Sequence, residues 1–260
     1  MNDFEMVTKT PITPAVTLEF IGCGDAFGSG GRSHTCMLVR GAGRPFLIDC
    51  GASAPVALQA RGVDVTALGL VVVSHLHGDH FGGVPFLLLD GAHNRPRAAP
   101  LVMAGPRGIE TRVWEALEVL YPGSRDTVAS RVPTRFVEIE AERAILLEGV
   151  HVTAHLADHS RTLTCFSLRV EVDGRVIAFS GDTRWTPALA ELARGADLFV
   201  CECSTYETPL ASHISYSELL DHAVELQETR TILTHLGPEA LPHAGDMRWP
   251  CAHDGMVVDL

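Results

Sequence analysis

Residues 74–80 read SHLHGDH and place three histidines and one aspartate in a window that begins at His75. The apolar run LGLVVV directly before this window is typical of a buried strand. In an extended segment, the imidazoles of His75 and His77 project to the same side because side chains alternate along a strand. The two histidines can therefore share one metal ion.

The second half of the window adds further ligands of the same kind. Gly78 allows the chain to turn, so that Asp79 and His80 approach the same place from a loop or a helix start. Imidazole and carboxylate groups together suit Zn²⁺, Mn²⁺ or Fe, and the window contains no cysteine, which argues against a closed structural zinc site. Four ligands are too many for one small site, so the stretch predicts a metal centre that extends beyond a single ion.

Composition indicates a globular chain and excludes several classes of protein. The 260 residues are 46% hydrophobic, which allows a large core, and we expect a single domain over residues 1–260 with residues 1–16 as a flexible extension. No signal peptide or membrane-spanning segment is predicted, so we expect a cytoplasmic protein with its seven cysteines reduced. The net charge of −12 argues against wrapping by nucleic acid.

Strands and helices alternate along the chain, which favours an α/β sandwich. Strands are predicted at residues 16–22, 35–41, 45–51, 68–75, 166–172, 175–181, 197–203 and 229–237, with further strands and turns between residues 136 and 160. Helices are predicted at residues 53–62, 108–123, 186–195 and 215–230. Ser53 and Ser215 are expected as N-caps, Gly62 as a helix end, and Asp173-Gly174 as a hairpin turn.

The motifs resemble those of the metallo-β-lactamase superfamily, whose HxHxDH pattern is matched by His75, His77, Asp79 and His80. The resemblance covers nearly the whole chain, from FIGCGDAFGSGGRSHTC and LIDCG through SHLHGDHFGG to SGDT and ILTHLG. This order is most similar to the ribonuclease Z and phosphodiesterase branch. The fold that the resemblance implies is a four-layer αββα sandwich with two metal ions at one edge of the paired sheets.

The resemblance also implies the remaining metal ligands. Asp182 in SGDT would bridge the two metals, and His235 in ILTHLG would complete the second site, to which Asp79 also belongs. The third ligand of the first site falls within HVTAHLADHS, which offers His151, His155 and His159. His159 fits the family pattern best because it precedes the strand that leads to the hairpin, and His155 remains the alternative.

We expect the two metal ions to be Zn²⁺, with Mn²⁺ or Fe as alternatives. Such a pair could lower the pKa of a bridging water and so provide hydroxide as the nucleophile. Asp79 would orient or deprotonate that nucleophile. His213 is the candidate proton donor for the leaving group, and Glu202 is the candidate group that orients it. His34 lies in the Gly-rich loop and is more simply interpreted as a solvated histidine.

Three departures from ribonuclease Z weaken a dedicated role on tRNA. The residue before Glu202 is Cys201 where the family often has histidine, the spacing around His213 differs, and only EVDGRV stands where many members carry a tRNA-gripping arm. We therefore expect a metal-dependent phosphodiesterase acting on small substrates. Ribonuclease Z-like processing of RNA, a lactone or thioester hydrolase, and a non-catalytic metal-binding scaffold remain as alternatives. Residues 100–123 could supply a pocket wall or the surface of a homodimer.

Overall fold

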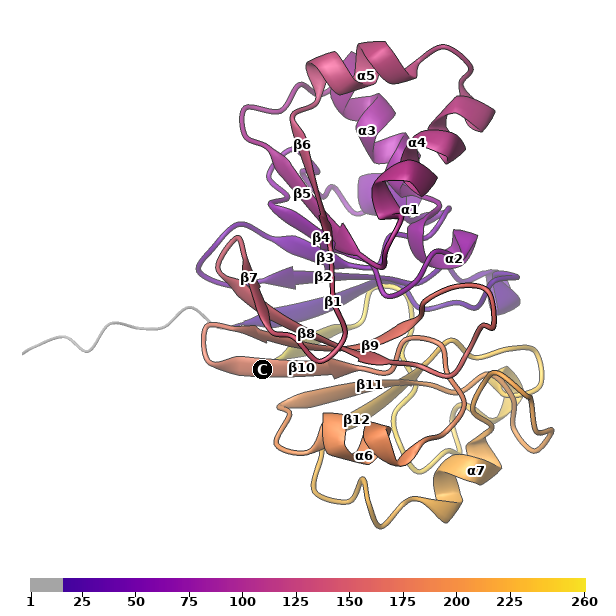
Figure 1. Cartoon of the computed structure of the whole chain (residues 1–260). Coiled ribbons are helices and arrows are strands. Elements are labelled where there is room, and N and C mark those ends of the chain that lie inside the picture. The colour runs from indigo at the N-terminus through magenta and orange to yellow at the C-terminus, as the bar shows by residue number, and fades with distance from the viewer. Residues whose placement is uncertain (1–15) are drawn as a thin grey trace, which may run out of the picture.

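Two β-sheets lie face to face at the centre of the molecule, with helices outside both of them (Figure 1). The computed structural model describes residues 16–260, so the extension predicted over residues 1–16 lies almost wholly outside the described residues. The first sheet has the order β13-β1-β2-β3-β4-β5-β6, and the second has the order β12-β11-β10-β9-β8-β7. The metallo-β-lactamase αββα sandwich predicted from the motifs is confirmed.

The strands of each sheet have the following bounds. Those of the first sheet are β1 (Thr17–Gly22), β2 (Cys36–Arg40), β3 (Phe46–Ile48), β4 (Leu70–Val72), β5 (Leu101–Gly105), β6 (Thr134–Glu138) and β13 (Val257–Asp259). Those of the second sheet are β7 (Ile145–Leu147), β8 (Val150–Leu156), β9 (Phe166–Val172), β10 (Arg175–Phe179), β11 (Leu198–Glu202) and β12 (Thr231–Thr234).

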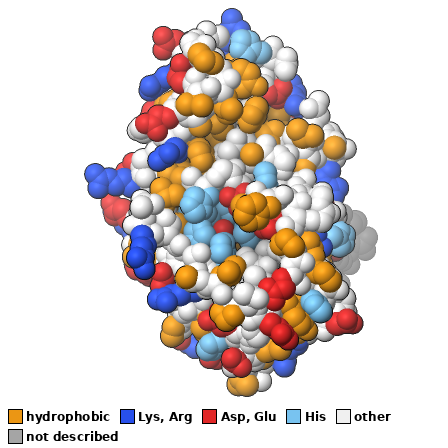
Figure 2. All heavy atoms as spheres, turned by 90° about the vertical axis from the view of Figure 1, so that its right-hand side faces the viewer, with side chains coloured by type: hydrophobic (Ala, Val, Ile, Leu, Met, Phe, Trp, Pro, Cys, Tyr) orange, Lys and Arg blue, Asp and Glu red, His pale blue; other side chains and the backbone are white. Residues whose placement is uncertain are grey.

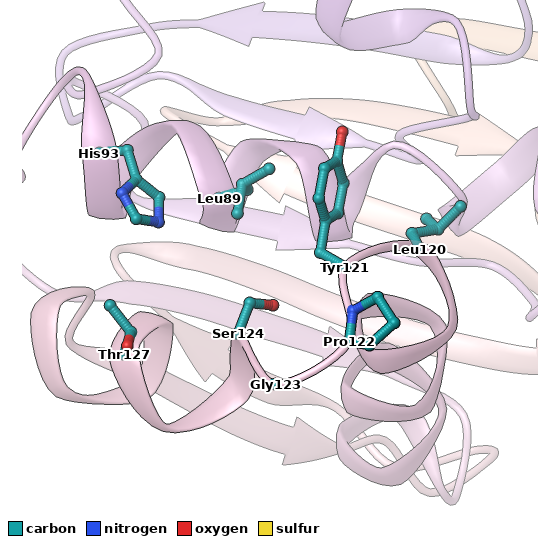
Figure 3. Close-up of a pocket in the computed structure, with 8 residues that line it drawn as sticks. All are labelled: Leu89, His93, Leu120, Tyr121, Pro122, Gly123, Ser124 and Thr127. Atoms are coloured by element: carbon teal, nitrogen blue, oxygen red, sulfur yellow. The ribbon is translucent and has the colours of Figure 1, made fainter.

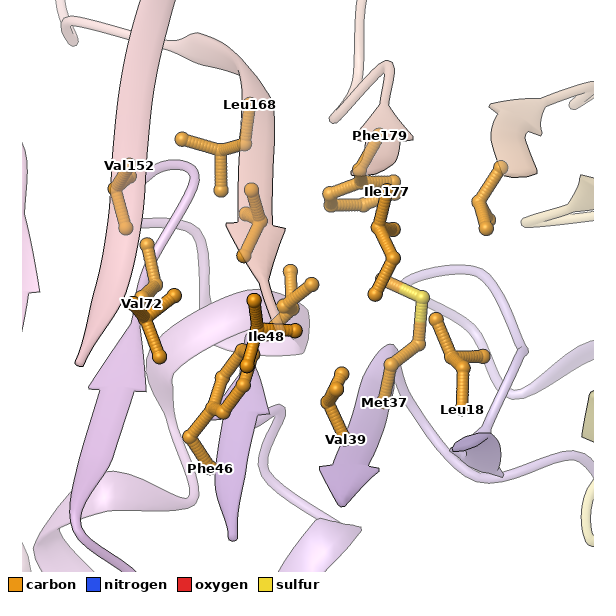
Figure 4. Close-up of a cluster of buried hydrophobic side chains, with 14 of the residues drawn as sticks. Leu18, Met37, Val39, Phe46, Ile48, Val72, Val152, Leu168, Ile177 and Phe179 are labelled. Atoms are coloured by element: carbon orange, nitrogen blue, oxygen red, sulfur yellow. The ribbon is translucent and has the colours of Figure 1, made fainter. Parts of the chain in front are cut away.

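Strands near the middle of the first sheet are apolar on both faces because each face is covered by another layer. In β2, Met37 and Val39 point into the core between the two sheets, whereas Cys36 and Leu38 pack against the outer helices. Figure 4 shows Met37 and Val39 in the inter-sheet core opposite Ile177 of the second sheet. The continuous apolar runs in the sequence therefore reflect burial on both sides.

Helices cover the outer face of each sheet. The first sheet is covered by α1 (Ala54–Ala60), α3 (Val84–His93), α4 (Ile109–Leu120) and α5 (Arg125–Arg131), with the short α2 (Gly78–Phe81) at its edge. The second sheet is covered by α6 (Pro187–Ala193) and α7 (Tyr216–Asp221). Short 3₁₀ turns span Ser29–Gly31 and Leu241–His243. None of the helices in residues 16–260 combines the length and hydrophobicity required to cross a membrane.

Local signals in the sequence located several of these elements correctly. Asp173 and Gly174 both have positive φ and join β9 to β10 as a two-residue hairpin. The backbone N–H of Glu218 donates to Ser215 Oγ at 3.2 Å and so caps α7. Gly62, at φ 67°, follows the end of α1 as expected.

Two local expectations were only partly correct. Ser53 occupies the N-cap position of α1 as expected, but it makes no side-chain capping bond, because its hydroxyl accepts the backbone N–H of His34 at 2.8 Å instead. The helix predicted over residues 215–230 ends at Asp221. Beyond this point the backbone N–H groups bond mostly three residues back, which gives successive tight turns that still bury Ala223 and Leu226.

Candidate metal centre

The candidate ligands gather where strands of both sheets end. Strand β3 runs parallel to β4, and β10 runs parallel to β11 and β12, so the carboxyl ends within each group lie at one edge. His75 follows β4, Asp182 follows β10, and His235 follows β12. Side chains placed just beyond the carboxyl ends of parallel strands are held by a rigid framework. This edge is therefore a suitable platform for a metal centre.

A first cluster consists of His75, His77 and His159. His75 Nε2 lies 3.0 Å from His77 Nδ1, and His159 Nε2 lies 3.0 Å from the same nitrogen. A tetrahedral ion with metal–nitrogen bonds near 2.0 Å requires ligand atoms separated by about 3.3 Å. The three ring nitrogens therefore converge at a spacing close to that of three ligands around one ion.

A second cluster consists of Asp79, His80, Asp182 and His235, all of them buried. Asp79 Oδ2 lies 3.3 Å from both His80 Nε2 and His235 Nε2. Asp182 Oδ1 lies 3.2 Å from His80 Nε2, and Asp182 Oδ2 lies 3.4 Å from His235 Nε2. These separations also match the edges of a tetrahedral site.

Two buried atoms in the second cluster indicate that a metal ion fits there. Within residues 16–260, neither His80 Nε2 nor Asp182 Oδ1 has a hydrogen-bond partner. Buried polar atoms are rarely left unpaired, and both atoms face the middle of a ring of metal-ligand groups. Asp182 Oδ2 also lies 3.7 Å from His159 Nε2 and 3.9 Å from His75 Nε2. Asp182 therefore stands between the two clusters.

The histidines are oriented by partners on their far ring nitrogens. His80 Nδ1 lies 2.7 Å from Asp49 Oδ2, and Asp49 in turn accepts the backbone N–H and the hydroxyl of Ser74 at 2.7 and 2.8 Å. His159 Nδ1 faces the backbone carbonyl of Ser212 at 2.9 Å, and His235 Nδ1 lies 3.2 Å from Ser204 Oγ. Such partners fix the tautomer and leave the other nitrogen free for a metal.

Asp49 is the main site residue that the sequence analysis missed. LIDCG was part of the family resemblance, yet its aspartate received no role. Asp49 is fully buried, directly follows β3, and has a positive φ of 58°, which is uncommon for a residue other than glycine. A carboxylate placed after an apolar strand at the same sheet edge as His75 was the available signal.

The electrostatics of the two clusters differ. Burial lowers the pKa of His75 well below its usual value and also lowers that of His77, so both imidazoles of the first cluster remain neutral, as metal binding requires. Burial opposes protonation of His80 and His235, but Asp182 raises the pKa of His80 well above its usual value and that of His235 to about 9, and the two imidazoles in turn hold the pKa of Asp182 well below its usual range. A divalent ion bound in the second cluster would therefore replace the protons on these two imidazoles.

His213 and Glu202 form a separate pair beside the clusters. His213 Nδ1 lies 3.0 and 3.1 Å from the two oxygens of Glu202, and its ring centroid lies 4.7 Å from that of His159. Glu202 is fully buried and also accepts the backbone N–H of Thr183 and the hydroxyl of Ser204. Burial opposes protonation of His213, but the bonded Glu202 carboxylate raises its pKa above the usual value. This pair can hold a proton beside the metal ligands.

The other candidate histidines lie elsewhere. His155 Nδ1 pairs with Glu142 at 2.9 Å, His151 is exposed on β8, and neither belongs to a described cluster of metal-ligand groups. The structure therefore brings His159, not His155, to His75 and His77. His34 accepts the backbone N–H of Ser53 at 3.2 Å and is likewise outside these clusters.

A pocket of about 360 Å³ opens onto both clusters. Its polar lining includes His77, Asp79, His159, Asp182, His213 and His235, and its apolar lining consists of Ala26, Phe27, Leu210 and Pro238. Figure 2 shows histidine and acidic side chains gathered in a hollow on this face, bordered by hydrophobic side chains. Residues 100–123 do not line this pocket; α4 instead borders a neighbouring apolar groove with Gly78, Phe81 and Phe86.

Another pocket lies between α3 and the segment that joins α4 to α5 (Figure 3). It is lined by Leu89, His93, Leu120, Tyr121, Pro122, Gly123, Ser124 and Thr127. His93 is the one titratable ligand type in this lining, which has no carboxylate or cysteine. It therefore lacks the donor set that the pocket over the two clusters possesses.

Comparisons with known proteins identify relatives that cover most of the chain. The chain is 25% identical over 264 residues to ribonuclease Z of Lachnoclostridium phytofermentans, covering 80% of this chain and 83% of the relative. It is 27% identical over 198 residues to ribonuclease Z of Mycolicibacterium paratuberculosis, covering 71% and 69%.

Solved structures show the same fold. The metallo-β-lactamase fold protein YhfI of Bacillus subtilis has a TM-score of 0.74 at 19% identity, over 94% of this chain and 99% of that one. The short form of human tRNase Z has a TM-score of 0.72 at 24% identity, over 93% and 98%. A diphosphatase from the PhnP family has a TM-score of 0.72 at 18% identity, over 94% and 98%.

Fold, relatives and ligand cluster together define a metal-dependent hydrolase of the metallo-β-lactamase superfamily, in its ribonuclease Z-like branch. The model of a particular family, described as "Anti-Pycsar protein Apyc1", matches residues 16–249, which is most of the chain. The chain belongs to this family.

Proposed function

We propose that the protein is a phosphodiesterase that works with two divalent metal ions, Zn²⁺ in the first instance, and acts on small phosphodiesters. The observation that carries this proposal is the pair of ligand clusters on either side of Asp182, at the base of one pocket. The ligands would be His75, His77 and His159 for one ion and Asp79, His80 and His235 for the other, with Asp182 shared. Mn²⁺ or Fe would fit the same donors.

Two metal ions held in this way would supply an acidified water as nucleophile and would stabilise negative charge on a phosphoryl group. Asp79 would orient that water, because its carboxylate lies within the second cluster and also lines the pocket. His213 would donate a proton to the departing alkoxide, since the buried Glu202 favours its protonated form and it faces the same pocket. Glu202 would act through His213 as a positioning residue.

The preference for small substrates rests on charge and on the β9–β10 hairpin. The chain carries a net charge of −12, whereas a long RNA is ordinarily held by a basic surface. Strands β9 and β10 are joined by Asp173 and Gly174 alone, so this hairpin provides no arm for gripping tRNA. A pocket of about 360 Å³ is adequate for a small diester.

Ribonuclease Z-like processing of RNA is the second candidate. It is favoured by the two relatives described above, which carry the name ribonuclease Z. The alignment with this chain covers 83% of one relative and 69% of the other. We expect cleavage of RNA to be weak and steeply suppressed by salt, because the described residues that line the pocket include no lysine or arginine to hold a long chain of phosphates. A lactone or thioester hydrolase uses the same nucleophile on carbonyl carbon, and a non-catalytic metal-binding scaffold would show no turnover.

One comparison separates these possibilities. The kcat/KM values of a bis-aryl phosphodiester, a cyclic nucleotide, a lactone and a precursor tRNA should be measured on one metal-loaded preparation. We expect efficient turnover of the small phosphodiesters. Efficient cleavage of the tRNA at its 3′ trailer would contradict the preference for small substrates, and turnover of the lactone with inert phosphodiesters would contradict the phosphodiesterase assignment. Sedimentation velocity on the same preparation would test the homodimer, which stays a prediction.

A further inference from the structure

Phe27 is unusually exposed for an aromatic side chain, with 89% of its surface accessible. It belongs to the apolar lining of the pocket that contains His77, Asp79 and Asp182. A single exposed hydrophobic residue on a surface needs no explanation. An exposed phenyl ring in a pocket lined by metal-ligand groups is different, because any molecule that enters can cover it.

The loop that carries Phe27 is held in place by a buried carboxylate. Asp25 Oδ1 accepts the backbone N–H groups of Phe27 and Ser29 at 3.2 and 2.8 Å, and Asp25 Oδ2 accepts the Ser29 hydroxyl at 2.7 Å. Gly28 closes the turn at φ 63° with a bond from its N–H to the carbonyl of Asp25. Polar bonds thus fix the backbone while leaving the phenyl ring outside the core.

The rest of the apolar lining comes from two other loops. Leu210 lies in the loop after β11, and Pro238 lies in the loop after β12. Glu239 joins these two loops, because its Oε1 accepts the backbone N–H groups of Glu207 and Thr208 at 2.9 and 3.1 Å. The apolar rim therefore comes from three loops that two carboxylates, those of Asp25 and Glu239, hold in place.

We propose that Phe27, with Leu210 and Pro238, forms an apolar clamp that selects phosphodiesters bearing a flat, unsaturated ring on an ester oxygen. The inference rests on the proposed function, because the phosphoryl group must sit at the metal ligands for its substituent to reach the rim. An aromatic ring stacks on another with a geometry that a saturated ring of similar size cannot adopt. Phe27 is thus the specificity-determining residue of the clamp.

The experiment compares two analogues of equal charge that cannot be hydrolysed, dibenzylphosphinate and bis(cyclohexylmethyl)phosphinate, in which a methylene group replaces each ester oxygen. Hydrophobic transfer alone favours the cyclohexyl compound at least as much, so a preference for the phenyl compound isolates the contribution of stacking. The ratio of their dissociation constants should be measured by calorimetry on metal-loaded wild type, Phe27→Ala and Phe27→Tyr. We expect the preference for dibenzylphosphinate to fall about fivefold in Phe27→Ala and to be retained in Phe27→Tyr.

Val119→Ala is the matched control, because Val119 is 81% exposed and lies outside this pocket. An unchanged ratio in Phe27→Ala, or an equal change in Val119→Ala, would overturn the clamp. Should Phe27→Ala fail to fold, Phe27→Leu removes the aromatic ring while keeping an apolar side chain, and the same loss of preference is expected. Turnover of bis(p-nitrophenyl) phosphate on the same samples tests the proposed function separately, since the phosphinates bind without being hydrolysed.

Discussion

The two ligand clusters are built differently although they share one sheet edge. All four residues of the second cluster are buried, and His80 is held by the fully buried Asp49. In the first cluster His77 and His159 are only partly buried, and the one partner of His159 Nδ1 among the described residues is a loop carbonyl, that of Ser212. The second cluster is therefore the more rigid of the two.

This difference implies an order of metal affinity. A hydrogen bond that a ligand donates to a buried carboxylate fixes the ligand more firmly than one donated to a carbonyl on a surface loop, and rigid ligands lose less entropy when an ion binds. We expect the second site to hold its ion more tightly than the first. Each of the following substitutions tests whether the two sites can be affected together or separately.

Asp182→Ala should have the largest effect because its carboxylate stands between the clusters, within 3.4 Å of His235 and 3.7 Å of His159. We expect the metal content, measured by mass spectrometry, to fall from two ions per chain to less than one. The kcat/KM value for a small phosphodiester should fall by more than about a thousandfold. Asp158→Ala is the control, since Asp158 pairs with Arg184 at the surface. A variant that kept one tightly bound ion would show that Asp182 belongs to one site only.

His159→Ala should affect the first site alone. We expect it to lose about one ion per chain while the ion at Asp79, His80 and His235 is retained. The reason is that His159 Nε2 lies 3.0 Å from His77 Nδ1 and that His159 does not belong to the second cluster. His155→Ala is the matched control, and it should keep its full metal content because His155 pairs with Glu142. The reverse pattern between the two variants would place the ligand at His155.

Sequence predicted the fold well because the fold depends on patterns that are local. Apolar runs such as LGLVVV mark strands covered on both faces, and the Asp173-Gly174 pair sets a hairpin by its own backbone preferences. The helix expected over residues 215–230 was too long because its apolar spacing fits tight turns as well as an α-helix. Periodicity alone does not separate the two.

The site was harder to complete because some of its contacts join distant segments. Asp49 and His80 are 31 residues apart; the apolar strand before Asp49 indicates that its carboxylate lies at the sheet edge, but not that it contacts His80 at 2.7 Å. Ser53 looked like a helix cap by its position, but its hydroxyl is used by the backbone of His34. The exposure of Phe27 likewise depends on how Asp25 folds its loop. The roles of these residues are therefore set by contacts in the folded protein that no local sequence pattern shows.

His213→Gln should leave both metal sites occupied and slow the reaction. We expect kcat/KM for a cyclic nucleotide, whose alkoxide leaving group needs a proton, to fall by about a hundredfold. The fall for a p-nitrophenyl diester should be much smaller, because p-nitrophenolate departs without a proton. A purely structural role for His213 would lower both rates alike. Glu202→Gln should reproduce the same contrast more weakly, since Glu202 acts through His213.

Asp49→Asn should have the smallest effect and should confine it to the second site. The amide retains an oxygen for the backbone N–H of Ser74 but removes the negative charge that His80 Nδ1 faces at 2.7 Å. Loss of such an outer partner typically weakens metal binding by about tenfold to a hundredfold. Stepwise competition with a chelator should therefore show that the ion in the second cluster is bound more weakly than in the wild type, whereas the affinity of the first cluster for its ion is unchanged. Ser53→Ala is the control, because the hydroxyl of Ser53 is bonded to the backbone of His34 and to none of the described metal-ligand groups. If Asp49→Asn weakened the binding of both ions equally, the two clusters would bind their ions as one unit. The different hydrogen-bond partners of His80 and His159 would then have no effect on affinity.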